Sequence, residues 1–303
     1  MKRFLDCETS EMMKMSKQEL VESLEASEGR ILVAECSLCG DRLLPPMSNA
    51  EISAAFGADL LLLNMFDVFH PEIKGIEAEP DEVIHTLKKL TGRLIGVNLE
   101  PIDTKETMIG EVTKICEGRM ASKQTIQKAK ELGIDFVLLT GNPGTGVSNR
   151  TICESLKTMR ETIGDSMMIM AGKMHAAGSK KEAGENILTK EVLKSFVDAG
   201  ADVILIPAPG TVPGITLEYV KEMVTYAHEL DALTITSIGT SQEGADEDTI
   251  RQIALLCKMS GTDLHHIGDA GFAPVVPESI LSYSIVIRGK RHAYARMSRS
   301  INR

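Results

Sequence analysis

The sequence predicts a single (β/α)₈ barrel, and three observations lead to this fold class. Eight short apolar segments alternate with helical patterns along the chain, and a Gly-x-Asp triplet stands before every second segment. The last two apolar segments each end in a Gly-rich turn. Buried strands that alternate with helices indicate a parallel sheet with right-handed crossovers, and eight such strands favour closure into a barrel. An open doubly wound sheet is the remaining alternative.

The N-terminal segment precedes the first apolar segment and has the pattern of an amphipathic helix over residues 9–27. Ser16 is placed to cap Lys17–Leu24, and Glu19 occupies the capping-box position. We expect this helix to cover the bottom of the barrel. The whole chain is read as one barrel domain, with a helical extension at 1–29, the barrel at 30–287 and a basic tail at 288–303.

The eight predicted strands are short, apolar and bounded by Gly or Asp. They are Ile31–Cys36, Asp59–Phe66, Arg93–Glu100, Asp135–Thr140, Met167–His175, Asp202–Pro207, Leu233–Ile238 and Asp263–Ile267. The Gly-x-Asp triplets are Gly57-Ala-Asp59, Gly133-Ile-Asp135, Gly200-Ala-Asp202 and Gly261-Thr-Asp263. A glycine there fits the end of a helix before a short loop into the next strand.

Composition and charge limit the classes of function. The 303 residues carry a net charge of −10, which argues against a broad nucleic-acid surface. No apolar run approaches the roughly 18 residues of a membrane helix, so we expect a cytoplasmic protein without a membrane partner. Six scattered cysteines are typical of reduced thiols. The oligomeric state is left open, with a homo-oligomer as one alternative.

The Gly-rich turns after strands seven and eight are the predicted anion site. In barrels of this class a phosphate is commonly held there by backbone N–H groups, where glycine permits close approach. The residues assigned to this site are Gly239, Thr240, Ser241, Gly268 and Asp269.

Polar residues at the predicted C-terminal ends of the strands are candidates for the substrate pocket and for catalysis. The pocket candidates are Asn64, Asn98, Thr140, Gly141, Asn142 and His266. Only one of His265 and His266 can point into the barrel, because adjacent strand residues face opposite ways. The other is expected to pack under a helix.

Lys173, His175, Glu100 and Glu35 are the candidate catalytic residues. Lys173 follows the apolar run MMIMAG, so burial would lower its pKa and make it an amine nucleophile or base. The alternatives are an ion pair with Glu100 or Glu35, or a role in binding a substrate anion. His175 would move protons near neutral pH.

Two further motifs bear on metal and nucleotide binding. Cys36-Ser-Leu-Cys39 is a CxxC without the two further ligands of a structural zinc site, and a pair of reduced thiols is preferred. Gly141-Asn-Pro-Gly-Thr-Gly146 lacks the Lys-Ser/Thr ending of a Walker loop, which rejects an NTPase. No cofactor is assigned. Mg²⁺ is the alternative, with Glu35, Asp67 and Glu100 as candidate ligands.

The Thr140-Gly141 and Gly144-Thr145-Gly146 pattern, with the Gly-Ala-Asp strand openings, resembles the BtpA-like group of bacterial phosphate-binding barrels. The resemblance implies a barrel with anion binding at Gly239-Thr240 and Gly268-Asp269, and it keeps a non-catalytic assembly or regulatory factor as an alternative. The chain is more distantly similar to phosphoenolpyruvate phosphonomutases, whose acidic Mg²⁺ cluster and Cys-Gly-His loop have no match here.

From the residues we expect an enzyme that acts on a small phosphorylated or carboxylated metabolite, by lyase or isomerase chemistry at the C-terminal face. Such reactions need one group that stabilises an enolate and one that moves a proton. Lys173 with His175 or Glu100 would provide both. An Mg²⁺-dependent enolate enzyme is the alternative within the same class.

Overall fold

Eight parallel strands close into a barrel in the order of the chain, which confirms the predicted (β/α)₈ fold. In the parallel ladder between the first and last strands, Ile31 pairs with Leu264, and this contact rules out an open sheet. The structure is a computed structural model that describes residues 1–103, 113–141, 144–175, 180–269 and 275–303. The strands are β1 Ile31–Ser37, β2 Leu60–Asn64, β3 Leu94–Leu99, β4 Phe136–Leu139, β5 Met168–Gly172, β6 Val203–Pro207, β7 Leu233–Ile238 and β8 Leu264–Ile267.

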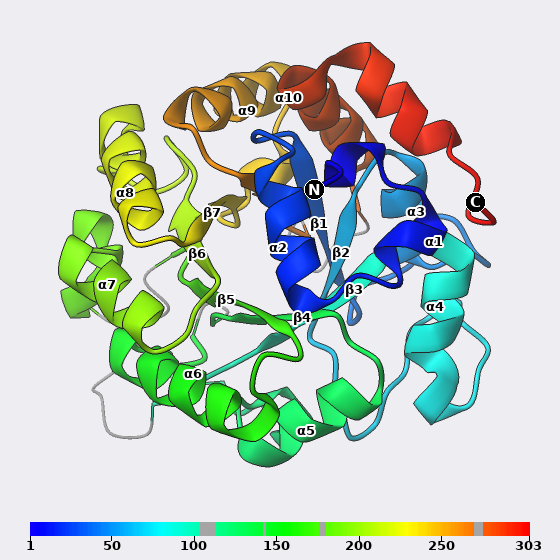
Figure 1. The fold of residues 1–303 in the computed structure, drawn as a ribbon, viewed down its shortest axis with the longest axis horizontal. Coiled ribbons are helices and arrows are strands. Elements are labelled where there is room, and N and C mark those ends of the chain that lie inside the picture. The colour runs from blue at the N-terminus through cyan, green and yellow to red at the C-terminus, as the bar shows by residue number, and fades with distance from the viewer. Residues whose placement is uncertain (104–112, 142–143, 176–179, 270–274) are drawn as a thin grey trace.

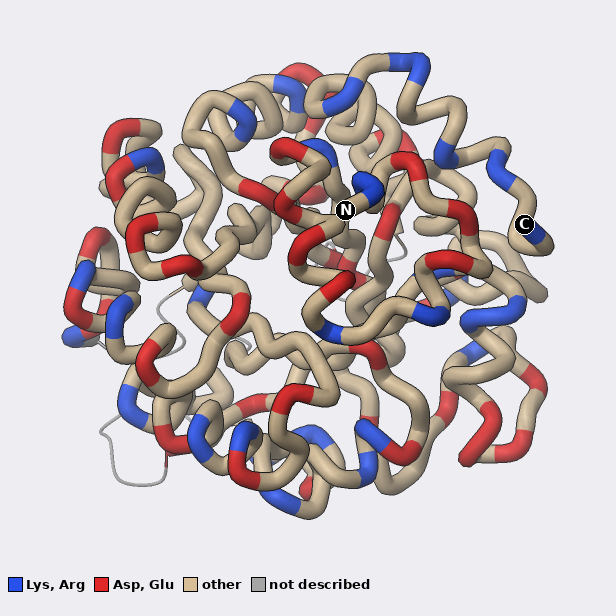
Figure 2. Tube along the Cα trace, in the orientation of Figure 1, with Lys and Arg blue, Asp and Glu red and all other residues tan. Residues whose placement is uncertain are grey.

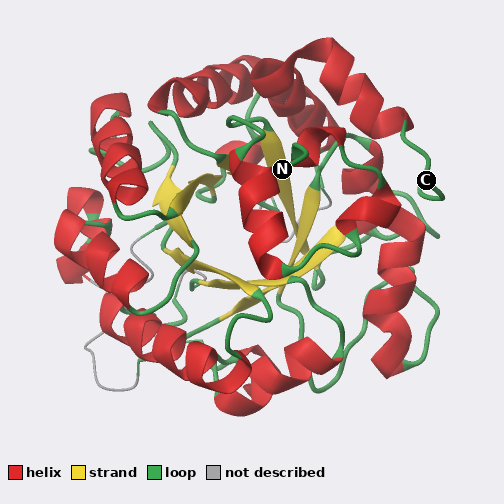
Figure 3. Cartoon of the chain, in the orientation of Figure 1, coloured by secondary structure: helices red, strands yellow, loops and turns green. Residues whose placement is uncertain are grey.

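Most of the helices form a ring around the strands, and one N-terminal helix lies across an end of the barrel (Figures 1 and 3). The helices are α1 Thr9–Met12, α2 Lys17–Glu25, α3 Asn49–Ala55, α4 Val83–Thr91, α5 Lys123–Glu131, α6 Asn149–Ile163, α7 Lys190–Asp198, α8 Leu217–Glu229, α9 Glu247–Ser260 and α10 Pro277–Ser298. Within the described residues no helix is both long enough and apolar enough to cross a bilayer.

Alternation along each strand divides the apolar residues into two cores. One set lies between the strands and the surrounding helices, and the other fills the interior of the barrel. Phe136 fills part of that interior because Gly96 on the neighbouring strand has no side chain. A Cβ on Gly96 would lie 2.2 Å from the Phe136 ring.

The N-terminal segment closes the bottom of the barrel, as predicted. Phe4, Met12 and Leu24 pack against the lowest layer of the interior core, and α2 crosses that end of the barrel in Figure 1. The expected single helix over 9–27 is divided into α1 and α2. The division has a local cause, because Ser16 caps α2 in a capping box with Glu19 and so begins a new helix.

The four Gly-x-Asp aspartates share one structural role at the bottom of the barrel. Each lies before an even-numbered strand and accepts a hydrogen bond from a backbone N–H of the preceding odd-numbered strand, at 2.7–2.8 Å. Each is also paired with a cationic or titratable side chain. The aspartates and these partners are Asp59 with Arg288 and Arg296, Asp135 with Lys88, Asp202 with Lys17 and Arg160, and Asp263 with His228.

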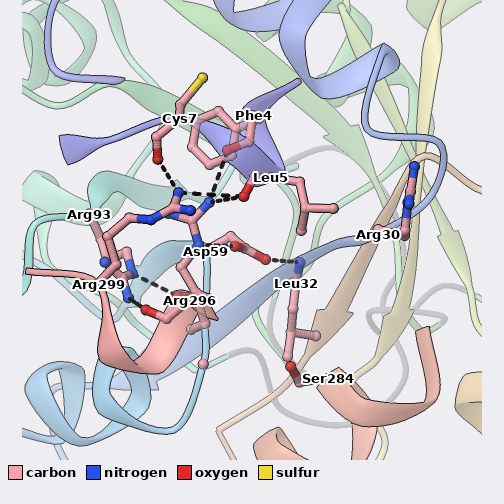
Figure 4. Close-up of polar contacts among 12 residues, drawn as sticks. Phe4, Leu5, Cys7, Arg30, Leu32, Asp59, Arg93, Ser284, Arg296 and Arg299 are labelled. Atoms are coloured by element: carbon pink, nitrogen blue, oxygen red, sulfur yellow. Dashed lines mark hydrogen bonds and ion pairs between the residues drawn. The ribbon is translucent and has the colours of Figure 1, made fainter. Parts of the chain in front are cut away.

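Asp59 is the most buried of these carboxylates, and the basic C-terminal segment supplies its partners (Figure 4). The segment predicted as a basic tail continues α10 beyond a kink at Gly289. Arg296 Nε lies 2.7 Å from Asp59 Oδ1, and Arg288 pairs with Oδ2. No acidic residue follows Glu278 in the sequence, and Figure 2 shows only Lys and Arg among the charged positions of this last segment.

Candidate active site

The C-terminal ends of the strands carry polar residues where the barrel interior would otherwise continue. Alternation from the apolar inner layers directs these side chains inward. They lie on six strands or directly after them: Glu35 and Ser37 on β1, Asn64 on β2, Asn98 on β3 and Glu100 just after it, Thr140 just after β4, Ser237 on β7 and His266 on β8. All of them are buried.

Glu35, His266 and Ser237 form a continuous contact across three neighbouring strands. His266 Nε2 lies 2.9 Å from Glu35 Oε2, and His266 Nδ1 lies 2.7 Å from Ser237 Oγ. The register explains the meeting, because Ser237 pairs with His266 and Val33, two residues before Glu35, pairs with His266 on the other side. The imidazole therefore bridges a carboxylate and a hydroxyl.

The adjacent histidine faces the other way, as alternation predicts. His265 Nε2 lies 3.0 Å from the Gly29 carbonyl oxygen, and Nδ1 lies 3.2 Å from the Tyr283 hydroxyl of α10. Burial lowers the pKa of His265 to about 4. This histidine joins the barrel wall to a helix and does not face the barrel mouth.

A chain of amides leads from β3 to the turn after β8. Asn98 Nδ2 donates to Asn64 Oδ1 at 3.4 Å, and Asn64 Nδ2 donates to Asp269 Oδ2 at 2.8 Å. Three other buried atoms on this side have no hydrogen-bond partner among the described residues: Ser37 Oγ, Asn98 Oδ1 and Thr140 Oγ1. Buried polar atoms are nearly always satisfied in native proteins, so three such atoms at one end of a barrel are unusual.

Lys173 lies directly after β5 and is 2% exposed. Its ammonium group pairs with Glu182 of the short helical turn Lys180–Glu182, and not with the predicted Glu100 or Glu35. The Glu182 oxygens also accept the N–H of Asn149 at the start of α6, at 3.3 Å. Burial lowers the pKa of Lys173 and Glu182 opposes that shift. Burial and then the charge of Lys173 lower the pKa of His175 to about 4.

The charge of Glu100 is balanced by an arginine and not by Lys173. It pairs with Arg119 in the loop before α5, and both side chains are nearly buried. The two candidate partners of Lys173 are therefore occupied by Arg119 and by His266.

The turns after β7 and β8 are filled by protein side chains. A Cβ on Gly239 would lie 1.9 Å from Met174 Sδ, and one on Gly268 would lie 3.4 Å from the Glu243 carboxyl carbon. The Gly268 N–H donates to the Ile238 carbonyl oxygen at 2.9 Å. Gly239 thus accommodates Met174, and Gly268 accommodates the β7 backbone, because a Cβ there would lie 2.8 Å from the Ile238 carbonyl oxygen.

The remaining residues of the predicted anion site are also engaged. Thr240 Oγ1 donates to the Thr211 carbonyl oxygen at 2.8 Å, and Asp269 accepts from Asn64. Ser241 adopts a left-handed backbone conformation with φ 78° and begins the short turn Gln242–Gly244. Its carbonyl oxygen accepts the Gly244 N–H.

Two carboxyl groups at the C-terminal face of the barrel, those of Glu243 and Glu35, have raised pKa values. Burial raises the pKa of Glu35, and hydrogen bonding to His266 opposes the shift. Burial also raises the pKa of Glu243, with Asp269 and Glu35 adding to the effect. Glu243 Oε2 has no hydrogen-bond partner in the described part of the chain. Glu243 and Glu182 were missed by the sequence analysis, because both lie in short turns without periodicity.

The candidate Mg²⁺ ligands do not converge. Asp67 accepts the backbone N–H groups of Phe69 and His70, while Glu35 and Glu100 face His266 and Arg119. No three acidic, His or Cys side chains within the described ranges are arranged to hold a metal. These residues do not fit Mg²⁺ as a preformed site.

The two thiols of the CxxC point to different surroundings. Cys36 is buried 3.4 Å from Ser53 Oγ, and burial raises its pKa to about 12, whereas Cys39 is exposed. Both thiols are free. Of the pocket candidates, Gly141 is buried and packs close to Val147, and Asn142 lies outside the described residues.

One family model matches residues 5–303, and its description is "Domain of unknown function (DUF7916)". No curated protein matches the chain. The family model does not carry the BtpA name, so that resemblance stays a prediction.

Two solved structures are similar in fold. A thiamine phosphate pyrophosphorylase from Pyrococcus furiosus is 16% identical, with a TM-score of 0.47 over 86% of this chain and 96% of that chain. A phosphonopyruvate hydrolase in complex with oxalate and Mg²⁺ is 12% identical, with a TM-score of 0.49 over 85% of this chain and 82% of that chain. Identities this low say nothing about the chemistry of this chain.

Proposed function

Since the chain belongs to the DUF7916 family, we propose from the barrel mouth itself that it is an enzyme that moves a proton on a small phosphorylated or carboxylated metabolite, by lyase or isomerase chemistry. The observation that supports this proposal is the buried contact of Ser237, His266 and Glu35 at the C-terminal ends of β7, β8 and β1. In (β/α)₈ enzymes the reacting groups lie at this end of the strands.

Glu35 is the proton-transferring group in this proposal. Its pKa is raised by burial, so its carboxyl group can take up and return a proton closer to neutral pH than an exposed glutamate. His266 Nε2 lies 2.9 Å from Glu35 Oε2 and faces this carboxyl group, and Ser237 is a positioning residue that orients the imidazole through Nδ1. Glu35 thus replaces the expected pairing of Lys173 with His175 or Glu100.

We place the anionic group of the substrate beside Lys173. The anion would displace the Glu182 carboxylate, which the chain seats between the ammonium group and an N–H at the start of α6. The turns after β7 and β8 suit an anion less well, because Met174 lies against Gly239 and the Glu243 carboxyl group lies near Gly268. No step is assigned to Mg²⁺.

The test is solvent exchange, which detects proton abstraction without knowledge of the product. Small 2-oxo acids, hydroxy acids and sugar phosphates are incubated with the protein in D₂O, and loss of the carbon-bound proton is followed by ¹H NMR. We expect exchange by the natural protein, a loss of about 10²–10⁴-fold in Glu35→Gln, and a smaller loss with a shifted pH profile in Ser237→Ala. The exposed Glu72→Gln is the matched control and should exchange normally.

A second candidate function rests on the rim of the same face. Leu43, Leu44, Met47 and Phe69, in the loops after β1 and β2, are 38–52% exposed. Exposed apolar residues near one another in a fold suit a protein partner, as in a non-catalytic assembly or regulatory factor. Failure of the natural protein to exchange any of the compounds would contradict the enzyme and favour this candidate.

A further inference from the structure

The side of the barrel mouth opposite β5–β7 carries one uncharged polar group on each of four consecutive strands, beside the inward carboxylates Glu35 and Glu100, which pair with His266 and Arg119. Ser37, Asn64, Asn98 and Thr140 take the inward positions at or just beyond the ends of β1, β2, β3 and β4. Ser37 pairs with Asn64 in the ladder, and Leu63 pairs with Val97, which sets Asn64 and Asn98 at the same height. All four side chains are at most 4% exposed. We call this set the amide–hydroxyl wall.

Three buried polar atoms of the amide–hydroxyl wall have no hydrogen-bond partner among the described residues. They are Ser37 Oγ, Asn98 Oδ1 and Thr140 Oγ1. Asn98 Oδ1 can only accept, and the two hydroxyls can both donate and accept. Leaving a buried polar group unpaired costs about 1–3 kcal/mol, so three of them together indicate a ligand that pairs with them.

The neighbouring charges narrow the chemistry of that ligand group. Asn64 is already bonded to Asp269, and Glu35 and Glu243 lie on the adjoining side of the mouth. A negative group placed against the wall would be repelled by these carboxylates, and an apolar group would leave the three atoms unpaired. A neutral hydroxyl group can donate to Asn98 Oδ1, and neutral hydroxyl groups can also accept from Ser37 or Thr140.

We infer that the amide–hydroxyl wall binds hydroxyl groups, so that the ligand is a hydroxylated acid or hydroxylated phosphate and not its deoxy analogue. The inference rests on the proposed function for the anionic group, which lies beside Lys173, and it adds the neutral part of the substrate. A site built to pair with a hydroxyl rejects the compound that lacks it, because its own buried groups are then stranded.

The experiment uses two matched series of probes that differ only in hydroxyl groups. One is succinate, malate and tartrate, and the other is propyl phosphate and glycerol 3-phosphate. Binding to the full chain is measured by calorimetry. We expect affinity to rise about 10–100-fold per hydroxyl in at least one series. Equal affinity along both series, or no binding by any hydroxylated member, would overturn the inference.

Variants separate the wall from the rest of the mouth. Thr140→Val keeps the shape of the side chain and should remove most of the preference for the hydroxylated member, while the deoxy member binds as before. Thr225→Val, at an exposed position on α8, should keep the full preference. Equal losses for both members of a pair in Thr140→Val would show a packing defect and contradict the inference.

Glu35→Gln distinguishes failure of this inference from failure of the proposed function. It should abolish proton exchange but keep the hydroxyl preference, because Glu35 is not part of the wall. A preference without exchange in the natural protein would leave the wall assigned and reject the enzyme. Proton exchange by the natural protein without any preference for hydroxylated ligands would support the enzyme and reject the assignment of the wall.

Discussion

The two ends of the barrel treat buried polar groups in opposite ways. At the bottom, each of the four aspartates before the even-numbered strands has a backbone N–H and a charged or titratable side chain as partners. At the top, Ser37, Asn98, Thr140 and Glu243 each keep an atom without a partner among the described residues. Each of the four bottom aspartates is thus paired within the chain, and the top has hydrogen-bonding capacity left for a ligand.

The pKa of Asp59 at the bottom and the pKa values of Glu35 and Glu243 at the top are shifted in opposite directions. Burial alone would raise the pKa of Asp59, but Arg288 and Arg296 outweigh burial and hold that pKa below its usual value. At the top, burial raises the pKa of Glu35 and of Glu243, and other carboxylates nearby strengthen the shift. The Asp59 charge therefore stabilises the fold at neutral pH, although burial raises the pKa of Asp135 at the same end. The charges of Glu35 and Glu243 at the top are held at a cost to stability.

The largest effect is expected at the bottom, for Asp59→Asn. The substitution leaves two buried arginines without their counter-charge, which costs about 3–5 kcal/mol of unfolding free energy. Urea denaturation followed by circular dichroism measures this loss. Because the pKa of Asp59 is lowered by folding, its contribution is present at neutral pH and is lost as pH falls through the native pKa, so the natural protein and the variant should converge in acid.

Asp165→Asn is the matched control for this prediction. Asp165 also pairs with Lys17 and Arg160, but it is 81% exposed. It should change the unfolding free energy by less than about 1 kcal/mol. Similar losses in the two variants would mean that the buried network at Asp59 is no more important than a surface pair.

An intermediate effect is expected for Lys173→Met, because the Lys173–Glu182 pair at the top is satisfied within the chain like those at the bottom. The substitution removes the partner of Glu182, which is only 19% exposed, and should cost about 1–3 kcal/mol in the same assay. Lys190→Met, in an exposed pair with Glu222, is the control and should change little.

The same pair tests the expected covalent role of Lys173. If Glu182 keeps the ammonium group charged, borohydride should trap no adduct with pyruvate on this lysine. A trapped adduct in the natural protein would show that desolvation prevails over the ion pair and would return Lys173 to the role of nucleophile.

The sequence predicted the features that depend on periodicity. Eight apolar segments and four Gly-x-Asp triplets were enough for the barrel, and alternation was enough to require that His265 and His266 face opposite ways. The function of the triplets was not visible, because Asp59 bonds to Leu32 on the preceding strand and that contact depends on strand register.

Contacts that depend on loop conformation were beyond the sequence. Lys173 was expected beside Glu100 or Glu35, but its partner Glu182 lies nine residues further along the chain in a short turn. The structure places Met174 Sδ against Gly239, a contact that the sequence did not indicate, and the anion site assigned to Gly239 stays a prediction. Neither Glu182 nor Met174 carries a pattern that predicts where a loop will place it.

The smallest effect, and the one of opposite sign, is expected for Glu243→Gln. Folding raises the pKa of Glu243, so the native state holds its proton to higher pH than the unfolded chain, and stability falls as pH rises between the two values. Glutamine cannot ionise and avoids this loss, so the variant should gain about 1 kcal/mol at pH 7.5 and nothing near pH 4. Glu161→Gln, at an exposed position on α6, should give no gain at either pH. A variant that is destabilised at both pH values would show that Glu243 holds the fold together as Asp59 does, and the contrast between the two ends of the barrel would then fail at this residue.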